Sequence, residues 1–134
     1  MTKLDGIIRL KKWELDEERR ALADLFDERT RAEEAIQFLE KEMLEQSQLS
    51  GSDIASVTLG AYIEGARNKK AWLMEALRLK DEEIAEKQDV VSQAFRELKT
   101  YEIADEGQKG RAKAALEKKE QSELDELALR AFEK

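Results

Sequence analysis

The chain has 134 residues, of which 41% are charged and 41% apolar, and it contains no proline, no cysteine and no histidine. Without cysteine and histidine there is no disulfide, no zinc-thiolate site and no imidazole base, which argues against an enzyme, a metal site or a bound cofactor. The net charge of −7 argues against nucleic acid as a partner, because affinity for phosphates needs clustered cations. No apolar run has the length of a membrane span or a signal peptide, so we expect a soluble, cytoplasmic protein.

The first third of the chain predicts one long helix. Apolar residues recur every seven positions in two rows, which is the pattern of a coiled-coil seam. Since neither proline nor a glycine after Gly6 interrupts the pattern, we expect a helix over about residues 3–46. The rows are Ile8, Leu15, Leu22, Arg29, Ile36 and Met43, and Leu4, Lys11, Glu18, Leu25, Ala32, Leu39 and Gln46.

A polar segment at about residues 47–55 predicts a turn. Between Gln46 and Ile63 the only charged residue is Asp53, and serine and glycine are frequent. Gly51 can adopt the positive φ that ends a helix, and Ser52 or Asp53 can cap the helix that follows.

A second heptad pattern predicts a helix over about residues 56–132. The pattern weakens beyond Tyr101, where Gly107 and Gly110 each cost about 1 kcal/mol relative to alanine in a helix interior. We therefore expect a locally less stable stretch of helix or a kink at 107–110. The rows are Ile63, Lys70, Leu77, Ile84, Val91, Leu98, Asp105 and Ala112, and Ala66, Leu73, Lys80, Lys87, Ala94, Tyr101, Gln108 and Ala115.

Together these elements predict an all-α fold in a single domain over residues 1–134. Two long helices joined by a short turn fold back as an antiparallel coiled-coil hairpin. A turn centred near Gly51 brings the start of the first helix beside about residue 100 of the second, which leaves a C-terminal helical overhang. An isolated helix of that length is marginal in water, so the overhang either frays or is held by another molecule.

Four charged residues lie in the predicted seam. We expect their aliphatic stems to pack between the helices while their charges reach water and fix the register. They are Arg29, Lys70, Lys80 and Lys87.

Trp13, Phe38 and Trp72 fall at outward positions of the heptads. Either they form a docking surface, as exposed aromatic residues often do, or they pack at the rim against the other helix. Trp13 lies within a basic stretch. No catalytic or phosphate-binding motif accompanies these residues, and the many paired carboxylates fit solvated helix faces.

Two segments at the ends of the chain carry a family resemblance. Residues 4–20 read LDGIIRLKKWELDEERR, and residues 117–130 read EKKEQSELDELALR. These segments resemble the N-terminal segment and the tail of the FliJ-type flagellar export proteins. The order of helix, polar turn and longer helix also matches. The resemblance, which extends to the YscO-type proteins of injectisomes, implies a non-enzymatic, stalk-like component of the type III protein export apparatus.

The resemblance also implies two partners, the hexameric export ATPase (FliI-like) and the cytoplasmic domain of the export gate (FlhA-like). The end that carries both termini would enter the ATPase ring, and the half nearer the turn would contact the gate. Such a protein is cytoplasmic and reaches the membrane only through its partners. The implied ATPase-ring contacts are Arg9, Lys12, Trp13, Arg19, Arg20, Arg111, Leu124, Leu127 and Arg130, and the implied gate contacts are Ala35, Leu39, Tyr62, Ala66 and Leu73.

Two other functions fit the same pattern. A self-associating structural coiled coil would pair its overhangs with each other. A chaperone for export substrates would use the apolar residues of the turn region instead of the terminal end.

Overall fold

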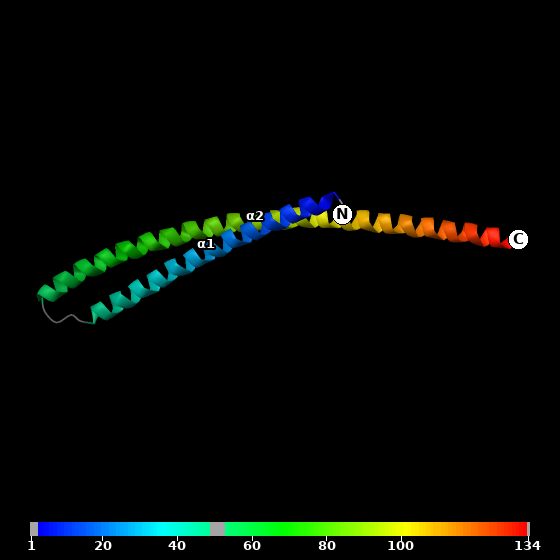
Figure 1. Ribbon diagram of the computed structural model, residues 1–134. Helices are drawn as coiled ribbons and strands as arrows, with labels where there is room; N and C mark the ends of the chain where they lie inside the picture. Colours follow the sequence, from blue (N-terminus) through cyan, green and yellow to red (C-terminus); the bar gives the residue numbers. More distant parts are fainter. Residues whose placement is uncertain (1–2, 49–52, 134) are drawn as a thin grey trace. The chain divides into compact units, whose positions relative to one another are not determined.

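The computed structural model describes residues 3–48 and 53–133, with side chains from residue 57 onward in the second range. These residues form two α-helices, α1 (Leu4–Ser47) and α2 (Asp53–Phe132), which are in contact with each other (Figure 1). The prediction of an all-α, two-helix hairpin is therefore confirmed. Among the described residues, neither helix is long and apolar enough to cross a membrane.

The C-terminal end of α1 is closed by local hydrogen bonds. The hydroxyl of Ser47 donates to the carbonyl of Leu44 at 2.7 Å, and the N–H of Gln48 donates to the carbonyl of Glu45 at 3.3 Å. Both bonds satisfy carbonyls that a helix end otherwise leaves unpaired. The predicted turn residue Gly51 and the predicted cap Ser52 lie outside the described residues.

The chain divides into two compact units, each of which contains part of both helices. We call residues 17–91 the turn unit, and residues 1–16 together with 92–134 the terminal unit.

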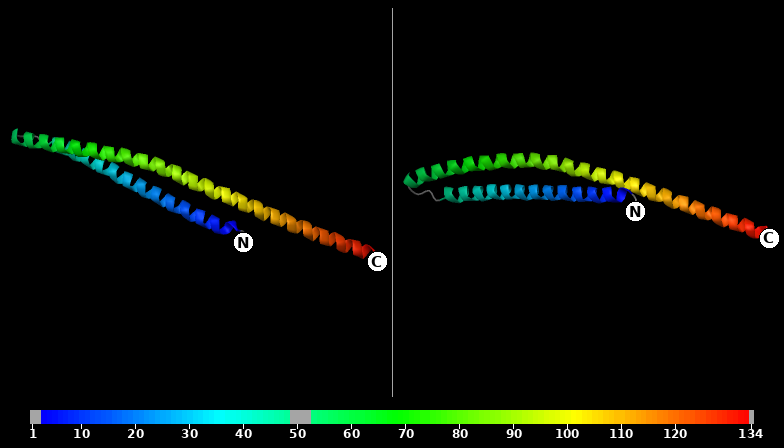
Figure 2. Two further views of the ribbon diagram at one scale, coloured as in Figure 1. Left: turned by 90° about the horizontal axis from the view of Figure 1, so that it is seen from above. Right: turned by 45° about the horizontal axis from the view of Figure 1, so that its top comes forward.

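In the turn unit, α1 and α2 run antiparallel and lie side by side in both views of Figure 2. Their buried apolar side chains come from the predicted seam rows, so the period of seven located this core correctly. They are Ile36, Leu39, Ala66 and Ile84, each at most 9% exposed.

In the terminal unit, the start of α1 packs on α2 through Leu15 and Leu98, which are 3% and 6% exposed. Lys11 pairs with Glu97 across the two helices at 3.2 Å. Beyond the start of α1, α2 continues alone (Figure 1), and every described residue from 111 to 133 is exposed.

The register in the terminal unit differs from the prediction. Asp5, which we expected close to residue 100 of the second helix, lies 3.8 Å from Lys109 between the carboxylate and ammonium groups. Helical side chains lean toward the N-terminus of their own helix. In an antiparallel pair, a side chain of α1 therefore meets a residue of α2 that has a higher number than the residue directly opposite its Cα atom. Long ionic side chains increase this difference in residue number.

The helix α2 is continuous through Gly107 and Gly110, where the sequence predicts a locally less stable stretch or a kink. A Cβ atom at Gly110 would meet nothing within 4 Å, and one at Gly107 would lie 3.4 Å from Nη1 of Arg111, the far end of a flexible side chain. Neither glycine is therefore required by a close contact.

Gly110→Ala is expected to stabilise α2 locally by about 1 kcal/mol, because alanine loses less conformational freedom than glycine in a helix. Hydrogen exchange of the amides around residue 110 should slow. Gly60→Ala, at an equally open site in the turn unit, should leave those amides unchanged. Faster exchange around residue 110 in the Gly110→Ala variant would show that the glycine serves a bend.

Candidate interaction surfaces

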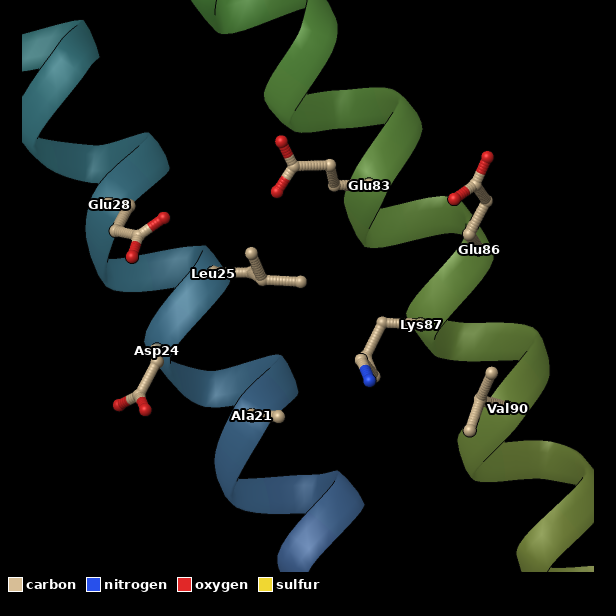
Figure 3. A pocket seen from close by; sticks show the side chains of 8 residues that line it. All are labelled: Ala21, Asp24, Leu25, Glu28, Glu83, Glu86, Lys87 and Val90. Atoms are coloured by element: carbon tan, nitrogen blue, oxygen red, sulfur yellow. The ribbon is translucent and has the colours of Figure 1, made fainter.

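The described residues contain an open groove between the helices and no cluster of metal-ligating side chains. No group of three or more carboxylates is placed to hold a metal ion within the described part of the chain. A groove between α1 and α2 in the turn unit is open, and its lining combines four carboxylates, one ammonium group and three apolar side chains (Figure 3). Such a lining supports ion pairing and helix packing. The lining residues are Ala21, Asp24, Leu25, Glu28, Glu83, Glu86, Lys87 and Val90.

Ion pairs cross between the helices along the turn unit. Each of the four charged seam residues has a carboxylate partner on the opposite helix, and the cationic side chains are only 22–34% exposed. Their stems are thus half-buried, as predicted, but their charges are paired with carboxylates, where we expected them to reach water. The pairs are Arg29–Asp81, Lys70–Glu40 at 3.0 Å, Lys80–Glu28 at 2.5 Å and Lys87–Glu18 at 2.8 Å.

In the terminal unit, two lysines bridge carboxylates. Lys11 lies 3.2 Å from both Glu14 and Glu97. Lys109 lies 2.8 Å from Asp105, whose side chain is 9% exposed. The hydrogen bond to Asp105 is the main cause of the raised pKa of Lys109. The ion pairs that cross between the helices, Lys11–Glu97 and Lys109–Asp5, fasten the start of α1 to α2.

The same pairing makes part of the stability depend on pH. Hydrogen bonds from Lys11 and then from Gln93 hold the pKa of Glu97 below its ordinary value of 4.5. A carboxyl whose pKa is lowered in the folded state adds stability above its unfolded pKa, and that stability is lost as pH falls through the folded pKa.

Glu97→Gln is therefore expected to destabilise the hairpin at about pH 7, and the difference from the native chain should shrink as the pH falls through the lowered pKa of Glu97. Urea unfolding of both chains at about pH 7 and at a series of lower pH values measures the difference. Glu120→Gln is the matched control, because Glu120 is exposed and makes no ion pair within the described residues. A loss of unfolding free energy for Glu97→Gln that does not depend on pH would contradict the view that ionised Glu97 stabilises the hairpin.

The residues implied in contact with the ATPase ring are all exposed. Trp13 is 60% exposed, and Leu124 and Leu127 are 61% and 60% exposed. Seven of the nine belong to the terminal unit, whereas Arg19 and Arg20 belong to the turn unit.

The residues implied in contact with the gate all belong to the turn unit, but the structure divides them by exposure. Leu39 and Ala66 are 7% and 6% exposed, so they belong to the core between the helices and offer little area to a partner. Ala35 and Leu73 are half-buried. Tyr62 is 39% exposed, and its hydroxyl donates to Glu42 at 3.1 Å.

Phe38 and Trp72 are 63% and 70% exposed, which excludes the alternative that they pack at the rim against the other helix. Residues three, four or seven apart share one side of a helix. Phe38 therefore lies beside Glu42 in α1. In α2, Tyr62, Lys69 and Trp72 lie along the same side. Because Tyr62 contacts Glu42, the three aromatic residues lie toward one side of the hairpin. We call Phe38, Tyr62 and Trp72 the aromatic face. The resemblance omitted two of its members, although their heptad positions indicated exposure.

Two contacting helices with an apolar seam and a series of cross-helix ion pairs define a coiled-coil hairpin protein. Among such proteins, the chain belongs to the FliJ family, whose model, described as Flagellar FliJ protein, matches residues 1–134. This family is a non-enzymatic component of the flagellar protein export apparatus, so the resemblance of the two chain ends is confirmed.

Curated relatives agree with this assignment. The Flagellar FliJ proteins of Caulobacter vibrioides strains NA1000 / CB15N and ATCC 19089 / CIP 103742 / CB 15 are each 28% identical to this chain over 126 residues. The match covers 93% of this chain and 91% of each relative. No solved structure matches the chain.

Proposed function

We propose that the chain acts as a stalk-like coupling component that binds the hexameric export ATPase through its terminal unit and the export gate through its turn unit. It would act at the cytoplasmic face of the export apparatus and contact the membrane only through these partners. The observation that carries the proposal is the FliJ family match along the whole chain.

The exposed end of α2 supports the assignment of the ATPase contact. Leu124 and Leu127 are about 60% exposed on a helix segment that no part of α1 covers. Burial of apolar area inside a ring would stabilise that segment by roughly 25 cal/mol per Å². Trp13, Arg9 and Lys12 add an aromatic anchor and cations, which are residue types that dominate binding energy at interfaces.

The aromatic face supports the assignment of the gate contact. Phe38, Tyr62 and Trp72 offer large, exposed side chains at low entropic cost. Patches of exposed aromatic residues on a monomeric chain indicate a binding surface.

The test is co-purification of the full chain with the export ATPase and with the cytoplasmic domain of the gate. We expect the hexameric ATPase to co-purify and its hydrolysis rate to rise, and the gate domain to bind separately. Failure of both partners to bind would overturn the proposal. Binding of export substrates to the aromatic face in place of the gate would favour the chaperone alternative.

A further inference from the structure

The groove between α1 and α2 in the turn unit lies on one side of the seam. On that side Lys80 contacts both Glu28 at 2.5 Å and Glu83 at 3.3 Å, and these two carboxylates line the groove. Arg29, by contrast, contacts Asp81, which does not line the groove. Because Asp81 and Glu83 are two positions apart, which is about 200° around α2, they flank the seam on opposite sides. The ion pairs thus distinguish a groove side from an opposite side.

The groove is open because short side chains flank the seam on the groove side. Ala21 and Val90 each lie seven positions from one of the two carboxylates that share Lys80, so they lie on the same side as those carboxylates. Phe26 and Gln88 are each two positions from a lining residue and place longer side chains on the opposite side. On the groove side the short side chains leave a volume of about 440 Å³.

The lining of the groove has more carboxylates than cations. Its one lining cation, Lys87, is already bound to a carboxylate of α1 at 2.8 Å. The carboxylates Asp24 and Glu86 form no ion pair within the described residues, and they lie at the outer edges of the groove, one on each helix (Figure 3). Arg31 contributes least of the groups that lower the pKa of Glu28. The two edges therefore carry negative charge that is available to a partner.

Apolar side chains lie between these two edges. Leu25 and Ala21 are half-buried, and Val90 is 43% exposed. Leu25 lies one helical turn after Ala21 and points from α1 toward α2 (Figure 3). The groove therefore combines an apolar base, parallel to the helices, with an acidic edge on each side.

We propose that this groove binds a helix of another protein, one whose apolar row is flanked by lysine or arginine. A helix fits because residues three or four positions apart would meet the apolar base along its length. Lysine and arginine can cover the edges with their aliphatic stems while their charged groups reach Asp24 and Glu86. A helix with acidic flanks would instead place carboxylates against carboxylates.

This surface goes beyond the proposed function. None of the residues that line the groove is among the implied contacts with the ATPase ring or with the gate. The apolar base is short, so we expect weak and reversible binding that depends on the charges at the edges.

Fluorescence anisotropy measures the binding of a labelled peptide to the full chain. The probe is a helical peptide of about three heptads, with leucine in its seam and lysine on both flanks. We expect this lysine peptide to bind, and a twin with glutamate in place of lysine to bind at least about tenfold more weakly. Equal binding of the two peptides, or no binding of the lysine peptide, would overturn the proposal.

Loss of the edge charges tests where the lysine peptide binds. Asp24→Asn with Glu86→Gln should weaken its binding at least about threefold. Asp27→Asn with Asp89→Asn is the matched control, because it removes the same charge from exposed residues of the same two helices outside the groove. The control should weaken binding by less than about twofold. Equal losses in the two double variants would show attraction to the overall negative charge and would overturn the proposal.

Filling the groove tests the apolar base without a change of charge. Ala21→Phe should weaken binding of the lysine peptide at least about fivefold, because the ring occupies the space of the incoming helix. Ala23→Phe is the control, since Ala23 is exposed, lies two positions away and does not line the groove. Unchanged binding by the Ala21→Phe variant would also overturn the proposal. Neither the ATPase nor the gate domain takes part in these measurements, so their failure leaves the proposed function standing.

Discussion

Leu39→Ala is expected to lower the free energy of unfolding of the hairpin by about 2–4 kcal/mol, whereas Phe38→Ala should change it by less than about 0.5 kcal/mol. The two residues are neighbours in α1, but Leu39 is 7% exposed and Phe38 is 63% exposed. Truncating Leu39 leaves a cavity between the helices, while truncating Phe38 removes a side chain that is mostly in water. Urea unfolding followed by circular dichroism at 222 nm measures both.

The same pair of variants separates structural support from partner contact. Phe38→Ala should weaken binding to the gate domain while the chain stays folded, because exposed aromatic residues provide much of the energy of an interface. Leu39→Ala should weaken binding only in proportion to the unfolded population. Loss of gate binding by a fully folded Leu39→Ala variant, with no effect of Phe38→Ala, would contradict the proposed aromatic face.

The seam rows explain why the core could be predicted from the sequence. A period of seven requires that the same side of each helix meets the partner, so residues such as Leu15, Ile84 and Leu98 are buried whatever the details of the turn. The half-buried stems of the seam cations follow from the same pattern, because Lys80 and Lys87 must direct their charges out of the seam. Their pairing with Glu28 and Glu18 does not follow from it.

The contacts that depend on side-chain reach could not be predicted in this way. The heptads put Asp105 in the seam, but they do not reveal that Lys109 bridges it to Asp5. That bridge depends on the lean of helical side chains and on the length of lysine, which a seven-residue pattern does not encode. The same pattern did place Leu39 in the seam, so its burial agrees with the heptads and not with its implied role as a gate contact.

Leu124→Ala combined with Leu127→Ala is expected to lower the affinity for the export ATPase at least about tenfold and to remove most of the stimulation of its hydrolysis rate. Both leucines are about 60% exposed, so their side chains contribute little to the stability of the free hairpin. Alanine keeps the helix intact because it has the highest helix propensity. The loss therefore reports the apolar area that the ring would bury. Titration of the native chain and the variant into the assembled ATPase, with the hydrolysis rate as readout, measures the effect.

Leu44→Ala is the control for that titration, because Leu44 is 63% exposed but belongs to the turn unit. It should leave the stimulation unchanged, whereas Trp13→Ala in the terminal unit should reduce it. Phe38→Ala should affect the gate domain and not the ATPase. If Leu44→Ala and the double leucine variant reduced stimulation equally, exposed leucines in general would be responsible, and the terminal unit would lose its assignment as the ATPase contact. If only the variants of the terminal unit lose ATPase stimulation, and Phe38→Ala loses only gate binding, the two partners must bind different surfaces of the chain.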